Sequence, residues 1–285
     1  MSSSSNHIDH TFDTSEPIVL HVENGRGLVD VTATDTAQTT IRITGERADE
    51  FDVRDLADGK GPRRIAILAP QRSGGVFGKD ARAEIVVEVP VGSGLSVKVG
   101  SSDVVTHGRF SDTRVDSGSG DITLDVVDGD TAVQSGSGDL VAEHLVGDAR
   151  AKTGSGDLRI VRADSDVVIT SGSGDVRVEE AAGELAVKTG SGDAQVGRVS
   201  GDVVFTTGSG DLVIGRAASG RITAKTASGD VTIGVAGGTP VWTDVRTASG
   251  RLSSSLPATG EPAEGQAFLE VRATTASGDV TLRQS

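Results

Sequence analysis

Apolar and polar residues alternate along most of this 285-residue chain, with the period of two that is typical of β-strands. In one segment, for example, Leu158 and Ile160 flank Arg159. No long stretch shows the 3.6-residue period of an amphipathic helix. We therefore predict an all-β fold in which the apolar member of each pair points inward and the polar one points to solvent.

This alternation is interrupted at a fixed interval by the phrase Ser-Gly-Ser-Gly-Asp or Thr-Gly-Ser-Gly-Asp. The phrase ends at Asp121 and returns every 18 residues as far as Asp211, and Gly-Asp or a close variant recurs at every ninth residue. Self-similarity at a fixed period indicates a solenoid. The pattern predicts a parallel β-helix, or β-solenoid, with 18-residue rungs, each made of two nine-residue half-units with one strand and one corner.

Around these repeats the chain divides into three parts. Residues 1–10 are polar and predict a disordered tail, and residues 11–99 predict a β-rich N-terminal part that is continuous with the solenoid and caps it. Within this cap, the segment Asn24-Gly25-Arg26-Gly27 predicts a tight connection between two strands. Residues 100–285 hold the repeats, with a loop insertion at residues 256–267.

The aspartates that end the repeated phrase form a first candidate site. Stacked copies would lie about 4.7–4.9 Å apart, and two carboxylates at that spacing repel by roughly 1 kcal/mol even in water. Each carboxylate could accept backbone N–H groups of its own or the next corner, or the column could bind Ca²⁺ as nonapeptide rolls do. We favour the structural interpretation, because the ligand spacing differs from that of the rolls. This corner ladder comprises Asp103, Asp121, Asp139, Asp157, Asp175, Asp193, Asp211 and Asp230.

A column of Ser and Thr residues precedes the same corners, from Ser135 to Thr275. We expect these hydroxyls to satisfy backbone groups of the corner. A nucleophilic role would need a neighbouring base, and no His recurs beside the column. The sequence therefore predicts no catalytic residue, no cofactor and no metal site.

Trp242, the single tryptophan, is a second candidate site. The alternation points it outward, in line with Arg221 one rung before it and Glu270 one rung after it. This arrangement fits a local cation–π stack, or alternatively a contact for a partner. The last repeat ends at Leu282, close to the C-terminus, which predicts an open strand edge there that could self-associate.

Charge and composition restrict the class of partner and the predicted location. The net charge of −14 argues against binding to nucleic acid or to an anionic membrane, and it favours cations or basic partners. The chain has no cysteine and no apolar run long enough to cross a membrane. Its first residues lack the basic and apolar regions of a signal peptide, which predicts a cytoplasmic protein.

Several segments outside the corners also form a recognisable series. They are residues 12–31, ending in Gly-Leu-Val-Asp-Val, residues 85–90, residues 97–99 and residues 238–256. Together with the serial Ser-Gly-Ser-Gly-Asp units, they make the chain resemble the bacterial "putative adhesin" family of β-strand-repeat proteins, a class of unknown function. The resemblance covers nearly the whole chain. It implies a single-stranded parallel β-helix and supplies no catalytic residues.

Four functions remain open from the sequence. The leading hypothesis is a non-enzymatic scaffold that presents flat faces to a protein partner. The alternative is a self-assembling structural solenoid of the bactofilin type. A calcium-binding roll and a polysaccharide-active β-helix enzyme are less favoured, the latter because the chain has no Tyr and a single Trp with which to stack sugars.

Overall fold

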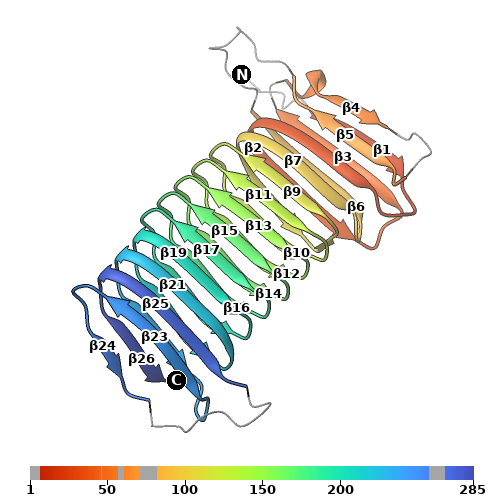
Figure 1. The fold of residues 1–285 in the computed structure, drawn as a ribbon. Coiled ribbons are helices and arrows are strands. Elements are labelled where there is room, and N and C mark those ends of the chain that lie inside the picture. Colours follow the sequence, from red (N-terminus) through yellow and green to blue (C-terminus); the bar gives the residue numbers. More distant parts are fainter. Residues whose placement is uncertain (1–6, 46, 57–60, 71–81, 257–266) are drawn as a thin grey trace. The chain divides into compact units, whose positions relative to one another are not determined.

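The computed structural model describes residues 7–45, 47–56, 61–70, 82–256 and 267–285. These residues fall into two compact units, Met1–Val146 and Gly147–Ser285. Their regular structure is β-strand apart from one short 3₁₀ helix, as Figure 1 shows. The all-β solenoid predicted from the 18-residue period is therefore confirmed.

The first unit contains twelve strands and the 3₁₀ helix η1 among its described residues. Their bounds are β1 His7–Asp13, β2 Val19–Thr34, β3 Gln38–Gly45, η1 Ala48–Glu50, β4 Asp52–Asp55, β5 Arg64–Leu68, β6 Arg82–Pro90, β7 Gly94–His107, β8 Arg109–Phe110, β9 Thr113–Ser117, β10 Ile122–Val127, β11 Thr131–Ser135 and β12 Leu140–Leu145.

The second unit contains fourteen strands among its described residues. Their bounds are β13 Ala149–Thr153, β14 Leu158–Ala163, β15 Val167–Ser171, β16 Val176–Ala181, β17 Leu185–Thr189, β18 Ala194–Val199, β19 Val203–Ser209, β20 Leu212–Ala217, β21 Gly220–Ser228, β22 Val231–Val235, β23 Val241–Thr247, β24 Leu252–Ser254, β25 Leu269–Ser277 and β26 Val280–Gln284.

In the first unit, the long strand β2 is already a rung of the solenoid. It pairs in parallel with β7 along nearly its whole length, from Val19 opposite Gly94 to Thr32 opposite His107. The tight connection expected at residues 24–27 is therefore wrong. These residues bend β2 between the two sheets without ending it, because both halves of the strand stay paired with β7.

Gly27 shows why this bend needs glycine. Its φ is +119°, a conformation that side chains disfavour, and a Cβ there would lie 2.1 Å from the carbonyl oxygen of Ala83. Gly27 is in register with Ser102, so it occupies the same corner as the repeated phrase.

The N-terminal end of the first unit changes from parallel to antiparallel pairing. On one sheet β3 pairs antiparallel with β6, and β1 pairs antiparallel with β3; on the other sheet β4 pairs antiparallel with β5. Ala48 of η1 and the adjoining Phe51 are buried at this end. The prediction of a disordered tail over residues 1–10 is wrong for residues 7–10, which belong to β1, because backbone pairing with β3 orders a segment of low hydrophobicity. Residues 1–6 of that prediction lie outside the described residues.

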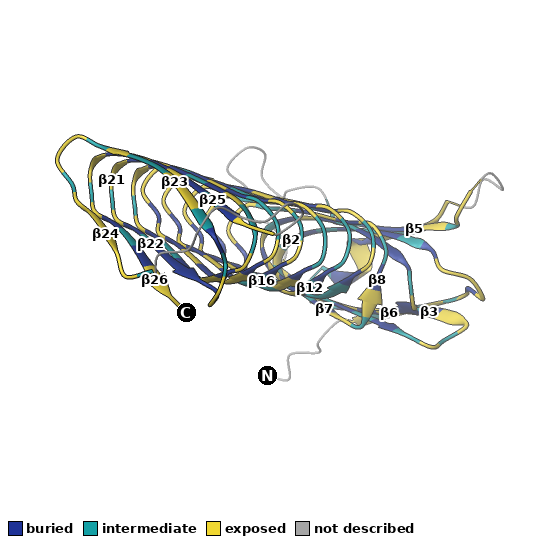
Figure 2. Cartoon of the chain, turned by 60° about the horizontal axis from the view of Figure 1, so that its bottom comes forward, coloured by how far each residue is buried: buried dark blue, intermediate teal, exposed yellow. Residues whose placement is uncertain are grey.

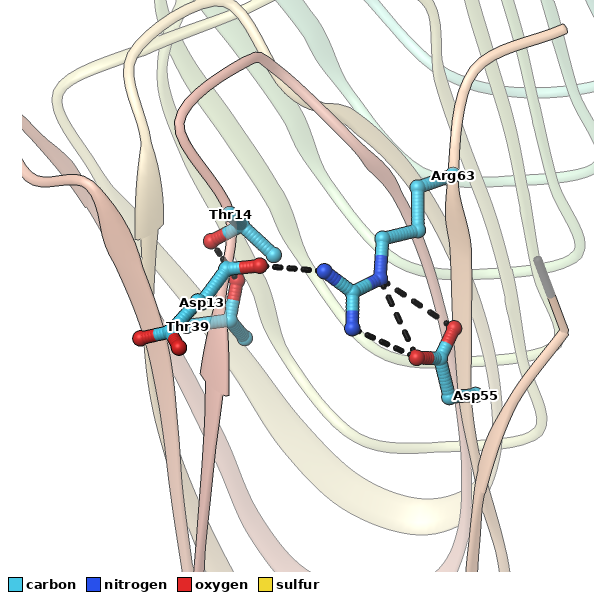
Figure 3. A network of polar contacts seen from close by, with 5 residues as sticks. All are labelled: Asp13, Thr14, Thr39, Asp55 and Arg63. Carbon is cyan, nitrogen blue, oxygen red and sulfur yellow. Dashed lines mark hydrogen bonds and ion pairs between the residues drawn. The ribbon is translucent and has the colours of Figure 1, made fainter. Parts of the chain in front are cut away.

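Polar side chains join the outermost strands of this end, as Figure 3 shows. Arg63 donates to both carboxylate oxygens of Asp55, from Nε at 3.1–3.2 Å and from Nη2 at 2.5 Å, and also to the carbonyl of Asp13. The Thr14 and Thr39 hydroxyls are 2.9 Å apart. Arg63 thus links β1 of one sheet to β4 of the other.

The core of each unit is a column of aliphatic side chains between two parallel sheets, and Figure 2 shows these inward positions as buried. The inward positions expected from the alternation are buried throughout the repeats. In the second unit, Phe205 is fully buried, in register with Val187 on one side and Ala224 on the other. The small Ala224 leaves room for the large ring, so the packing is complementary between neighbouring rungs.

Within the second unit, rungs stack 18 residues apart as predicted, as in Ala149 opposite Val167 and Leu158 opposite Val176. The order changes at the C-terminal end. Strand β21 pairs with β25, and β25 pairs with β23, while β22 pairs with β26, and β26 pairs with β24. The last rung of the sequence therefore lies inside, and the rung before it, β23–β24, lies at the end.

This order corrects two expectations. Trp242 is not between Arg221 and Glu270; instead Glu270 lies between Arg221 and Trp242. The strand ending near Leu282 is not the open edge, because β26 is paired on both sides. The predicted loop at residues 256–267 falls largely outside the described residues.

Candidate functional site

Most corners that carry the repeated phrase are built by one hydroxyl and one close backbone approach. The exceptions are the corners after Thr207, Thr226 and Thr275, whose buried hydroxyls have no hydrogen-bond partner among the described residues. The N–H of Gly138 donates to Oγ of Ser135 at 3.0 Å, and the same hydroxyl donates to the carbonyl of Gly138 at 3.0 Å. A Cβ on Gly174, at the equivalent corner of the second unit, would lie 2.0 Å from the carbonyl oxygen of Gly156 in the preceding rung. The corner thus needs glycine because successive rungs touch there through their backbones.

The corner aspartates are hydrogen-bonded from one rung to the next. In the first unit, Oδ1 of Asp103 accepts the N–H of Asp121 at 3.1 Å. In the second unit, Oδ1 of Asp193 accepts the N–H of Asp211 at 2.8 Å. Each of these bonds brings a backbone dipole to a carboxylate, which offsets the repulsion between neighbouring carboxylates.

The reordered rungs extend the ladder beyond Asp230. Oδ1 of Asp230 accepts the N–H of Asp279 at 2.7 Å, and Oδ1 of Asp279 accepts the N–H of Arg251 at 2.8 Å. The opposite corners carry a second ladder, in which Asp166, for example, accepts the N–H of Glu184 at 2.8 Å. Along the described chain, no group of three or more His, Asp or Glu side chains is placed to hold a metal ion.

The cluster around Trp242 centres on Glu270. Its carboxylate binds Arg221 at 2.9 Å and Arg272 at 2.6 Å, and its side chain is only 14% exposed. The hydrogen bond from Arg221, assisted by the one from Arg272, lowers the pKa of Glu270 below its usual value. The guanidinium of Arg272 also lies over the Trp242 ring, 5.7 Å from its centroid, so the ring contacts a cation while half of its surface stays exposed.

A signal for the changed rung order was present in the sequence. Val271 and Leu282 occupy inward positions of the interior rung and are buried, whereas their counterparts on the end rung are Thr243 and Ser254. The more apolar rung is therefore the one covered on both sides. Comparing inward residues of the degenerate repeats would have identified the end rung.

One outer sheet face carries a column that sequence reasoning missed. It runs across β13, β15, β17, β19, β21, β25 and β23 in register. Lysine or arginine alternates with threonine along it, at Lys152, Thr170, Lys188, Thr206, Lys225, Thr274 and Arg246. In the sequence, this column is indicated by a basic residue that recurs at every second rung, at Lys152, Lys188 and Lys225.

The lysines of this column, Lys152, Lys188 and Lys225, are exposed, and none of them forms an ion pair within the described parts of the chain. The neighbouring outward column is apolar over three rungs, where Ala186 lies in register between Val168 and Val204, which are 44% and 37% exposed. We call these six residues the lysine face. It combines uncompensated positive charge with an apolar strip.

A search against protein-family models matched residues 18–283 to the Toastrack DUF4097 family. No curated protein matched the chain. Among the described residues, no helix is long and apolar enough to cross a membrane.

Several solved structures match the chain along nearly its whole length. A putative adhesin from Parabacteroides merdae is 13% identical, with a TM-score of 0.47 and coverage of 97% of each chain. A putative adhesin from Bacteroides fragilis is 13% identical, with a TM-score of 0.43 and coverage of 98% of each chain. A putative lipid binding protein from Parabacteroides distasonis is 12% identical, with a TM-score of 0.42, covering 98% of this chain and 97% of its own.

Proposed function

The chain belongs to the Toastrack DUF4097 family, and from that premise we propose that it is a non-enzymatic interaction scaffold whose lysine face binds a protein partner. The observation that carries this proposal is the pairing of exposed cations with exposed valines on one flat sheet. Val168 and Val204 are held outward by strand alternation, and Lys152, Lys188 and Lys225 flank them without counter-ions among the described residues.

The charge of this face favours an acidic partner. Although the chain as a whole carries a net charge of −14, its acidic residues include two ladders at the corners of the rungs. The lysine face is basic, so it is complementary to an acidic patch on another protein. The general preference for basic partners inferred from net charge does not apply to this face, because net charge carries no information on where the charges lie.

We further propose that the corner ladder has a structural role. Each carboxylate that accepts the N–H of the next corner has one oxygen committed to the backbone, which supports a role in holding rungs together rather than in binding Ca²⁺. The cytoplasmic location expected from the sequence remains a prediction.

Carbodiimide cross-linking, which joins lysine amines directly to carboxylates, tests the scaffold function. We expect partner peptides from a native lysate to be joined to Lys152, Lys188 and Lys225. Capture of the same partner in a pull-down without cross-linker should be lost in the triple variant Lys152→Gln, Lys188→Gln, Lys225→Gln and should weaken as salt rises.

A matched control removes three positive charges from the other sheet of the same unit. Arg177, Arg216 and Arg283 are exposed on β16, β20 and β26, and their triple change to Gln should leave capture unaffected. Equal capture by the wild type and the lysine triple variant would contradict the proposal.

A further inference from the structure

The rung formed by β23 and β24 ends the second unit with unpaired strands. Among the described strands, β23 pairs with β25 alone and β24 pairs with β26 alone. The strand edges on the far side of this rung therefore present backbone groups that no described strand pairs, in both sheets. Such an edge is a template for another β-strand.

The hydrogen bonds show which residues present these groups. The carbonyl of Pro240 accepts the N–H of Leu269 at 2.9 Å, so the even-numbered residues of β23 face β25. Thr243, Val245 and Thr247 consequently turn their N–H and C=O groups to the free edge.

Strand β24 also turns alternate residues to the free edge. The carbonyl of Arg251 accepts the N–H of Val280 at 2.9 Å, and the N–H of Ser255 donates to Leu282 at 3.0 Å. The odd-numbered residues therefore face β26, and Leu252 and Ser254 turn their backbone groups outward.

Within the described part of the chain, no element covers the inward side chains of the end rung. Leu252 occupies an inward position but is 51% exposed, and a cavity of about 280 Å³ lined by Val241, Thr243, Leu252 and Leu256 among others adjoins it. The N-terminal end of the first unit differs, since Ala48 and Phe51 are buried there. The C-terminal rung thus combines an unpaired edge with uncovered apolar side chains.

Both strands of this rung have self-complementary sequences. In β23, residues 243–247 read Thr-Asp-Val-Arg-Thr, with identical ends and opposite charges on either side of Val245. After the corner, residues 252–256 read Leu-Ser-Ser-Ser-Leu, symmetric about Ser254. Because the four residues 248–251 turn the corner, counting back from it places Ser254 across the core from Val245.

We propose that this rung binds a second copy of the chain, head to head, about a two-fold axis through Val245 and Ser254. Antiparallel pairing about Val245 places Asp244 opposite Arg246 of the partner subunit, and Thr243 opposite Thr247 of the partner subunit. Within one chain Asp244 and Arg246 form an ion pair at 3.3 Å, in which Arg246 is exposed and Asp244 half-buried, so both can exchange partners across the axis.

The backbone and the side chains agree with this axis in both sheets. Val245 and Ser254 each direct their N–H and C=O groups to the free edge, so each forms a hydrogen-bonded pair with its own copy. Asp244 and Arg246 then fall in non-hydrogen-bonded pairs, in which side chains approach more closely. On β24, the axis places Leu252 opposite Leu256 of the partner subunit, which covers the open core.

A charge-swap experiment on the full chain tests the interface by sedimentation equilibrium over a range of concentrations. The wild type should show a monomer–dimer equilibrium. Asp244→Arg and Arg246→Asp should each weaken dimerisation about tenfold or more, because each creates two like-charged cross-strand pairs. An equimolar mixture of the two variants should regain the wild-type affinity as a heterodimer, since opposite charges then meet at both positions.

A second variant separates the interface from folding. Val245→Pro removes an N–H that makes no hydrogen bond to a described residue, and proline is tolerated on a free edge. It should abolish the dimer while leaving the circular dichroism spectrum and melting temperature close to those of the wild type. A wild type that stays monomeric, polymers that grow beyond dimers, or a variant mixture without rescue would overturn the proposal. The lysine face takes no part in this test, so the two proposals can fail separately.

Discussion

At the scale of single residues, the corner explains why the repeat is so regular. Asp193 accepts the N–H of Asp211 at 2.8 Å, and Thr189 accepts the N–H of Gly192 at 3.0 Å, so one hydroxyl and one carboxylate satisfy the bend. Glycine between them lets the backbone of one rung touch the next. These are properties of side-chain type, which is why the same residues recur in corner after corner.

The ladder predicts different outcomes for two substitutions of Asp193. Asp193→Ala removes the acceptor for Asp211 and should lower the free energy of unfolding by about 0.5–1.5 kcal/mol. Asp193→Asn keeps an acceptor oxygen and removes a charge from a column of like charges, so it should be less destabilising than Asp193→Ala. Urea denaturation followed by circular dichroism measures both.

Thermal melts with Ca²⁺ test the alternative interpretation, in which the corner ladder binds calcium. We expect millimolar Ca²⁺ to leave the melting temperature of the wild type unchanged relative to chelator, because a ligand that binds the folded state alone would raise it. A rise in the wild type that Asp193→Asn abolishes would support the calcium interpretation over the structural one.

Glu270 predicts a pH dependence at the same scale. The hydrogen bond from Arg221 lowers its pKa in the folded state below the usual 4.5, so the charged carboxylate stabilises the fold above pH 4.5. This contribution is lost as the pH falls through the lowered pKa. The melting temperature of the wild type should therefore exceed that of Glu270→Gln at pH 6, and the difference should shrink below pH 4.5.

The arginine partner offers a control for the Glu270 prediction. Arg221→Gln removes the largest cause of the shift, so its melting temperature should lose most of the same pH-dependent difference. If Glu270→Gln and the wild type respond identically to pH between 6 and 3, the ion pair does not contribute to stability.

At the scale of elements, the exchange of the last two rungs follows from their inward residues. Strand β25 buries Leu269, Val271 and Ala273, whereas β23 presents Val241, Thr243 and Val245 at the matching positions. Burying the more apolar strand on both sides removes more apolar surface from water. The less apolar strand is left at the end, where its inward side is partly exposed.

Hydrogen exchange distinguishes this order from sequential stacking. In dilute protein, amides of β25 should be protected on both sides of the strand, while those of Thr243, Val245 and Thr247 in β23 should exchange quickly. Sequential stacking predicts the reverse ranking. Protection of the three β23 amides that appears only at high concentration would report the head-to-head dimer.

At the scale of the whole molecule, each unit is stabilised by contacts between neighbouring rungs. Such one-dimensional stacks have stabilities that sum over rungs and their interfaces. The fold also separates charge, since the acidic ladders lie at corners while the lysine face lies on a sheet of the second unit. Both features depend on how rungs stack and neither belongs to any single rung.

Phe205 tests the contribution of one interior rung. It is fully buried, and Phe205→Ala should lower the free energy of unfolding by about 3–5 kcal/mol because the neighbouring Ala224 cannot fill the cavity. Phe205→Leu should cost less, since it keeps more of the volume. Urea titration monitored by circular dichroism measures both, and equal losses would show that the rungs relax to fill the space.

The local patterns of the chain were enough to predict the solenoid, its 18-residue register and its inward residues. Strand alternation and corner chemistry act between residues that are close in sequence or one repeat apart, so they are visible without coordinates. The ordering of residues 7–10 and the continuous bend at residues 24–27 were missed, because both depend on pairing with strands elsewhere in the chain.

The repeated phrase therefore predicts that a rung forms, but it does not determine which rungs stack on each other. Rungs β23–β24 and β25–β26 carry similar corner signals, and the choice between two stacking orders depends on the total apolar surface that each order buries. This difference in buried apolar surface depends on residues that are far apart in the sequence. The stacking order that results places Glu270 between Arg221 and Trp242 and leaves Val245 at an edge that no described strand pairs. The lysine face likewise exists only once rungs stack, because stacking alone brings Lys152, Lys188 and Lys225 into one column.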